Sequence, residues 1–124
     1  MGARIASMAL RLFFLINLVL GLYFWISGNT SLVDLHMLVG ILFVISLWVY
    51  SAIVGLQTGN VGFVAGCFAL GLLIVIVGMT QESILEGPNH WLVQILHLLL
   101  AIIAIGFAEA FGARARRTAQ ARTA

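Results

Sequence analysis

The chain has 124 residues, of which 63% are hydrophobic and only 8% are charged. Soluble domains are about half apolar and about a quarter charged, so this chain cannot cover itself with a surface that suits water. A bilayer core about 30 Å thick takes about 20 helical residues, and four such spans use roughly 80 residues. The remainder is too short for a large extramembrane domain, a nucleotide-binding fold or a second enzyme domain, and a β-barrel is also excluded.

Apolar segments separated by polar turns predict one domain over residues 1–124 with four membrane spans. The first segment could instead be a signal peptide, because small residues follow its apolar run, but we interpret it as a helix of the bundle. Short connections make consecutive helices antiparallel. The fold class expected is therefore an all-α integral membrane protein, an up-down-up-down bundle of four transmembrane helices. The spans are expected at about 6–27, 32–56, 61–79 and 90–111, followed by a short basic tail, 112–124, that we expect to be frayed or disordered.

All six basic residues are arginines, and they lie only at the two ends of the chain. The positive-inside rule then places both termini in the cytoplasm, which requires an even number of crossings. We expect the inner membrane of a bacterium or archaeon, and we interpret the arginines as a topology signal with no nucleic-acid partner. Glu109 lies near the inner end of the last span, where its carboxylate is expected to reach toward Arg11 or the tail arginines.

Histidines are the main candidates for chemistry, because ionisable residues inside spans are costly and are functional by default. His36 lies about one turn into the second span and His97 about two turns into the fourth. Both helices enter from the outer side, so at 1.5 Å per residue both imidazoles lie roughly 6 to 11 Å below the outer helix ends. Two histidines at matched depth are what the axial ligands of one haem iron require. The alternatives are interhelical hydrogen bonds, a metal other than haem, or a proton relay.

Small residues lie one turn deeper than each histidine, namely Gly40 after His36 and Ala101 after His97. They share the faces of the ligands, so we expect them to leave room for a flat macrocycle. His90 is two turns outward from His97, and we interpret it as a helix-start residue that is a secondary candidate for contact with a propionate or a redox partner. No CxxCH motif is present, so the expected cofactor is non-covalent haem b.

Three stretches resemble the haem A synthase family: Asp34 to Gly40, Ala69 to Gly78, and Val93 to Ala101. That family is built from two similar four-helix bundles, each with a histidine pair for a b-type or related haem, and this chain resembles one such half. The resemblance implies that His36 and His97 are haem ligands. It does not extend to the synthase reaction, because Val33 stands where the family usually has a glutamate, Met37 stands where it often has an arginine, and the outer-loop cysteine pair is absent.

The leading hypothesis is a membrane b-type cytochrome with one bis-histidine haem near the outer face, exchanging electrons with a quinone or a redox partner protein. The alternatives are a haem-modifying enzyme that acts as a homodimer, a haem-free structural subunit of a membrane complex, and a small transporter. A transporter is disfavoured because no carboxylate or arginine lies in the middle of the membrane. Any homodimer is expected to use the glycine-rich face of the third span, where Gly62 and Gly66 form a small-xxx-small pair.

Overall fold

The computed structural model describes residues 1–123, and over that range every regular element is helical. The elements are α1 (Gly2–Ser27), α2 (Val33–Thr58), α3 (Val61–Thr80), a single 3-10 turn η1 (Gln81–Ser83) and α4 (Trp91–Thr123). All four α-helices are long and apolar enough to cross a membrane. The predicted all-α bundle of four membrane-spanning helices is confirmed, and the chain has the character of an integral membrane protein.

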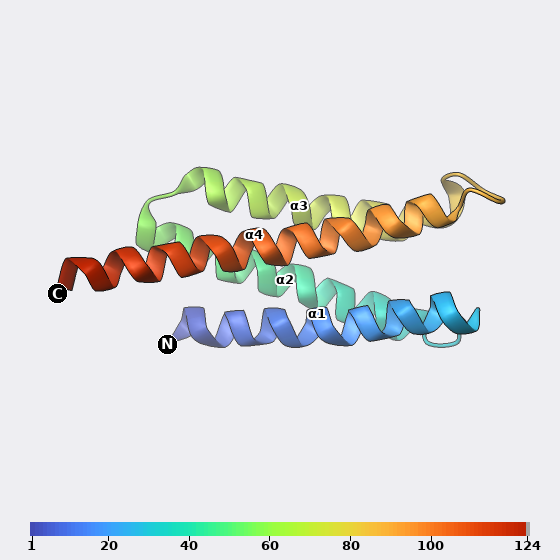
Figure 1. Ribbon diagram of the computed structural model, residues 1–124, viewed down its shortest axis with the longest axis horizontal. Helices are drawn as coiled ribbons and strands as arrows, with labels where there is room; N and C mark the ends of the chain where they lie inside the picture. The colour runs from blue at the N-terminus through green and yellow to red at the C-terminus, as the bar shows by residue number, and fades with distance from the viewer. Residues whose placement is uncertain (124) are drawn as a thin grey trace.

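The helices run up and down with both termini at the same end of the bundle (Figure 1). We call this end the arginine end, and the opposite end, which holds the α1–α2 and α3–α4 connections, the histidine end. Consecutive helices pack closely, whereas α1 and α4 make only sparse contact where they close the bundle. The seam between α1 and α4 is therefore the least filled part of the structure.

Glycine and asparagine residues define the ends of the helices. Gly28 and Gly59 end α1 and α2 with φ of 66° and 67°, left-handed values that glycine adopts without a steric cost. The side chain of Asn60 accepts a hydrogen bond of 2.8 Å from the main-chain nitrogen of Phe63 and so caps the start of α3. These caps satisfy main-chain groups that would otherwise be unpaired near the membrane.

The buried core follows α2, which packs against all three other α-helices. Its largest enclosed side chains are Phe43, Leu47 and Tyr50, joined by Leu10 of α1 and Cys67 of α3. Nine further apolar residues of the described chain are buried, most of them small or medium in size, whereas many large apolar side chains lie on the outside. An apolar exterior is stable in lipid, so this distribution agrees with a membrane-spanning bundle.

Three glycines of α3 face neighbouring helices within the chain. A Cβ built on Gly66 would lie 3.2 Å from Phe107, one on Gly71 would lie 2.4 Å from Trp48, and one on Gly78 would lie 2.9 Å from His97. Most of the glycine-rich face of α3 is thus used to bring α2 and α4 close. The homodimer stays a prediction, and on α3 only the exposed small residues Gly62, Ala65 and Ala69 are free to form it.

The segment after the fourth span differs from the expectation that it is frayed. In the structure α4 continues without interruption through residues 112–123, so the expectation of a disordered tail is wrong over this range. The segment is rich in alanine and arginine, both strong helix formers, and contains no proline, while its one glycine, Gly112, lies at its start. Residue 124 lies outside the described part of the chain.

Candidate functional site

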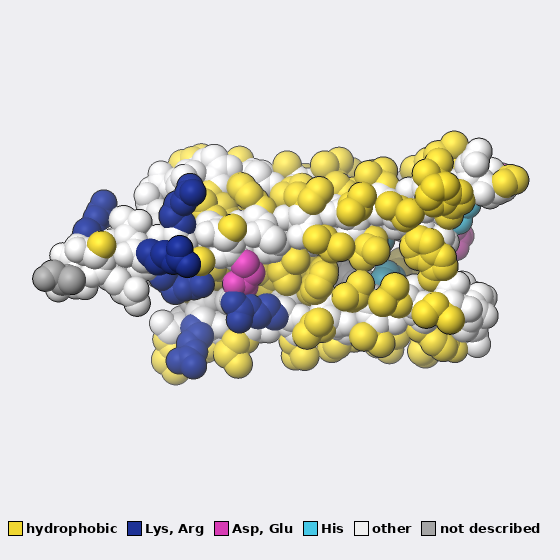
Figure 2. Space-filling model, in the orientation of Figure 1, with side chains coloured by type: hydrophobic (Ala, Val, Ile, Leu, Met, Phe, Trp, Pro, Cys, Tyr) yellow, Lys and Arg dark blue, Asp and Glu magenta, His cyan; other side chains and the backbone are white. Residues whose placement is uncertain are grey.

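A cavity of about 360 Å³ lies at the histidine end, among α1, α2, α4 and the end of α3. Its deeper wall is mainly apolar, and its mouth carries polar side chains. The apolar lining includes Phe14, Leu18, Val33, Phe43, Ile74, Leu98 and Ala101, and the polar lining includes Thr30, Gln81, Glu82, His90 and Gln94. Figure 2 shows histidine atoms in an opening between α1 and α4, so the cavity reaches the outside through the α1–α4 seam.

His36 and His97 meet in this cavity, one from α2 and the other from α4. Their ring centroids are 6.4 Å apart and their planes are inclined by 55°. Residue counting predicts that His36 and His97 lie at the same depth, and the structure shows that they are also side by side. The ring of Phe24 packs edge-on against His36 at a centroid distance of 5.4 Å and limits how far that imidazole can turn.

Glycines on two helices make room for the two imidazoles. A Cβ on Gly21 of α1 would lie 3.6 Å from Cε1 of His36, and a Cβ on Gly78 of α3 would lie 2.9 Å from Cε1 of His97. The second distance is shorter than any ordinary carbon contact, so only glycine fits at position 78 with His97 in this place. Neither glycine was singled out as a site residue from the sequence, because their register against the histidines depends on how the helices are rotated.

One ring nitrogen of each of these histidines lacks a partner within the described chain. Nδ1 of His36 and Nδ1 of His97 are buried without a hydrogen bond. Leaving buried polar groups unpaired costs about 1 to 3 kcal/mol each, so such groups require an explanation.

The distance between the two imidazole rings can be compared with the distance expected for two histidine ligands of one haem iron. An iron bound through one nitrogen of each imidazole, at about 2 Å from each, places the ring centroids about 6 Å apart. The observed 6.4 Å agrees with this value. The cavity volume also lies in the range of about 300 to 1,000 Å³ that is usual for pockets of small molecules and cofactors.

Two of the other predicted site residues lie in the cavity and one does not. Ala101 is in the wall near His97, and His90 is at the mouth, two turns outward. Gly40 does not line the cavity, because the side-chain amide of Asn17 lies over it. A Cβ built on Gly40 would lie only 2.9 Å from that amide. The small size of Gly40 serves the contact between α1 and α2, and the expectation that it leaves room for a macrocycle stays a prediction.

Asn17 forms this contact through both ends of its amide. In the orientation that its neighbours require, the amide nitrogen donates to the main-chain oxygen of His36 at 2.9 Å, and the amide oxygen accepts from the main-chain nitrogen of Gly40 at 3.1 Å. Asn17 thus fixes the position of α1 against the turn of α2 that carries His36. The sequence signal for this contact is a polar residue in the middle of an otherwise apolar span.

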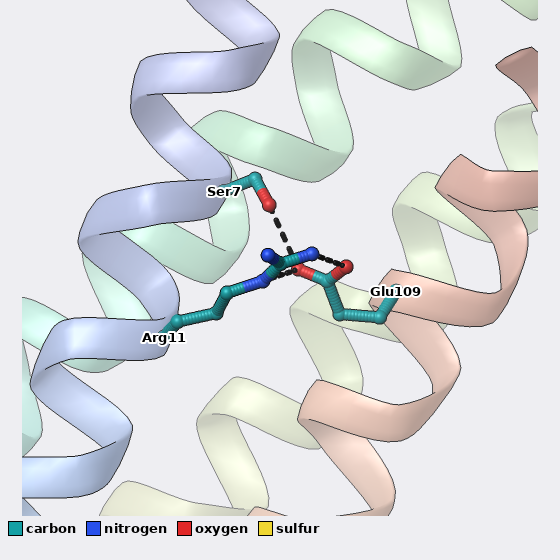
Figure 3. A network of polar contacts seen from close by, with 3 residues as sticks. All are labelled: Ser7, Arg11 and Glu109. Carbon is teal, nitrogen blue, oxygen red and sulfur yellow. Dashed lines mark hydrogen bonds and ion pairs between the residues drawn. The ribbon is translucent and has the colours of Figure 1, made fainter.

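A second polar contact joins α1 and α4 at the arginine end. The guanidinium of Arg11 donates to the two carboxylate oxygens of Glu109 at 3.0 and 2.5 Å, and the hydroxyl of Ser7 donates to Glu109 at 2.8 Å (Figure 3). Of the partners expected for Glu109, the structure selects Arg11. This network holds α1 against α4 at one end of their seam, while the histidine cavity occupies the other.

No other cluster of potential metal ligands forms among residues 1–123, where no group of three or more His, Cys, Asp and Glu side chains comes together. Comparison with protein-family models, curated proteins and solved structures found no match to the chain.

Proposed function

We propose that this protein is a small membrane cytochrome that holds one non-covalent b-type haem between His36 and His97. The observation that supports the proposal best is the histidine pair itself, two imidazoles from different helices with centroids 6.4 Å apart in a cavity of about 360 Å³. Structural hydrogen bonding, the main alternative role, is less well supported because Nδ1 of each imidazole is buried without a hydrogen-bond partner in the described chain.

The residues around the pair have separable roles in this proposal. His36 and His97 would hold the iron through one ring nitrogen each, and Gly21 and Gly78 allow α1 and α3 to keep those rings in place. The apolar wall would limit the access of water to the site. A bound haem would supply a one-electron ferrous–ferric couple, and ligation by two histidines would favour electron transfer over oxygen activation.

The orientation in the membrane follows from the arginines. Because arginine-rich ends stay in the cytoplasm, the arginine end faces inward and the histidine end outward. The haem would then lie in the outer half of the bilayer of a bacterial or archaeal inner membrane. The opening of the cavity between α1 and α4 favours a redox partner that reaches it from the lipid phase or the outer surface, such as a quinone or a partner protein.

A haem-modifying activity like that of haem A synthase is the second candidate, supported by the motifs around both histidines. Val33, at the position of the family glutamate, lies in the cavity wall. The chain therefore presents an aliphatic side chain to the cavity where that reaction is thought to need a carboxylate, and this favours the cytochrome. The activity would be detected as a newly oxidised methyl group on farnesylated haem extracted after co-expression.

Absorption spectroscopy tests the proposal. The full chain is expressed with adequate haem supply and purified in detergent, and a reduced-minus-oxidised spectrum is recorded for wild type, His36→Ala and His97→Ala. His90→Ala is the matched control, because His90 lines the same cavity at its mouth. We expect low-spin haem bands in the wild type and in His90→Ala, and their loss in the other two variants. A wild type without bands would refute the cytochrome, and an unaltered spectrum in either ligand variant would refute the ligand assignment.

A further inference from the structure

A second cavity lies at the arginine end, between the start of α1, the end of α2 and the extension of α4, with a volume of about 1110 Å³. Arginines from both ends of the chain line it, and we call it the arginine cleft. They are Arg4 and Arg11 from α1, and Arg114, Arg116 and Arg122 from α4. Residues more than a hundred positions apart are thus gathered around one hollow, which a topology signal alone does not require. Figure 2 shows arginine side chains gathered at this end.

The charge of the cleft is largely uncompensated. Within residues 1–123 the only ion pair is that of Arg11 with Glu109, so the other four arginines of the cleft have no acidic partner there. Guanidinium groups bind phosphate oxygens with several donors and with little loss of hydration. An anion in the cleft would therefore relieve repulsion among the arginines and satisfy their free donors.

The rest of the lining mixes polar side chains (Ser7, Gln57, Thr58, Asn60 and Thr118) with apolar ones, and the apolar ones favour a lipid over a small anion. Met8, Val54 and Phe111 line the cleft beside the arginines. The cleft lies at the end of the bundle where the apolar spans end. A ligand with a charged head and apolar chains can use both the arginines and these surfaces, whereas free phosphate can use only the arginines.

We propose that the arginine cleft binds the phosphate headgroup of an acidic phospholipid. Basic pockets between transmembrane helices are suited to such headgroups. The extension of α4 through residues 112–123 provides three of the five arginines, so its helical structure has a function in forming the cleft. The proposal does not depend on haem, because the cleft and the histidine cavity lie at opposite ends of the bundle.

The chain offers a matched pair of variants for the test. Arg114 and Arg117 are both exposed, lie on the same helix and have no ion-pair partner in the described chain, but only Arg114 lines the cleft. Arg114→Gln and Arg117→Gln therefore remove the same charge from different surfaces. Thermal unfolding without added lipid confirms that both variants fold like the wild type.

Binding is measured on the full chain in neutral detergent, by native mass spectrometry with phosphatidylglycerol or phosphatidylcholine. We expect adducts with phosphatidylglycerol to dominate. Arg114→Gln should lower that affinity about fivefold, the effect of one basic residue close to an anionic lipid, and Arg117→Gln by less than about twofold. Equal binding of the two lipids, or equal losses in the two variants, would overturn the proposal. Full displacement of phosphatidylglycerol by inorganic phosphate would also overturn it and identify a site for a free anion.

Discussion

Replacement of Gly78 by alanine tests how closely His97 is positioned for ligation. A Cβ at this position would lie 2.9 Å from Cε1 of His97, and 3.6 Å from both ring nitrogens. Carbon atoms prefer separations of about 3.5 Å or more, so the imidazole must move by about 0.6 Å or α3 must retreat by that amount. Because the atom that is struck is the end of a side chain, the ring can turn away and the bundle can fold with little loss of stability.

The same displacement is large for a metal ligand. Distances from metals to their ligands are held within about 0.2 Å, so a movement of about 0.6 Å is about three times that tolerance. Overpacking of this kind costs about 1 to 3 kcal/mol, which corresponds to a haem affinity roughly 5-fold to 150-fold weaker. We expect Gly78→Ala to weaken haem binding by this factor and to convert part of the low-spin signal to high spin.

The assay is a haem titration of the apoprotein in detergent, followed by absorption. Gly106→Ala is the matched control, because a Cβ at Gly106 of α4 meets nothing within 4 Å. This variant should bind haem like the wild type. If Gly78→Ala also binds haem with wild-type affinity and an unchanged low-spin spectrum, the assigned position of His97 is wrong.

Further predictions concern the contacts that fix the helices around the cavity, each measured by unfolding in detergent. Asn17→Ala should lower the free energy of unfolding by about 0.6 to 2 kcal/mol. Gly40→Ala displaces the same amide and should lower it by a similar amount. In the double variant, the Gly40→Ala substitution should add no further loss, because the amide is already absent. Glu109→Gln removes the carboxylate that pairs with α1 and should cost about 1 kcal/mol, because the pair is only partly exposed. Gly112→Ala would drive a methyl group into the hydroxyl of Tyr50, which is buried without a partner, and should cost about 1 to 3 kcal/mol, with less cost in a Tyr50→Phe background.

Control variants show whether these losses of stability come from the named contacts or from any substitution of a polar side chain. Asn89→Ala and Glu86→Gln change exposed side chains of the α3–α4 loop and should leave stability unchanged. Additive costs for Asn17→Ala and Gly40→Ala would show that the two residues do not act as one contact. A loss in Glu86→Gln equal to that in Glu109→Gln would contradict the role of the ion pair, and a tolerated Gly112→Ala would contradict the packing of Tyr50.

The sequence predicts those features that follow from the position of a residue along its helix and from the cost of placing polar groups in lipid. Hydropathy placed the four spans, and the fixed rise of a helix placed His36 and His97 at one depth. A cationic partner for Glu109 is predictable because a carboxylate near the end of a span needs a cation, whereas the choice of Arg11 over the tail arginines comes from the structure. Each of these inferences needs only the axial position of a residue, which counting supplies.

The parts that sequence could not predict depend on the rotation of each helix about its axis. The spans are apolar on all sides, so no hydrophobic stripe indicates which face is inside. This is why sequence alone does not connect Asn17 with Gly40 or Gly78 with His97, and does not show that most glycines of α3 face α2 and α4 within the chain. The helical tail has a different cause, because alanine and arginine favour a helix whatever the charge of the arginines indicates about topology.

The central claim is that one haem is held by His36 and His97, and its most direct test is the stoichiometry of binding together with the spin state. Apoprotein in lipid nanodiscs is titrated with haem while the absorption of the oxidised and reduced forms is recorded. The account predicts saturation at one haem per chain with low-spin bands in both states, and the loss of both features in His36→Ala and in His97→Ala. Binding that does not saturate, or a low-spin haem that persists in both variants, would contradict it.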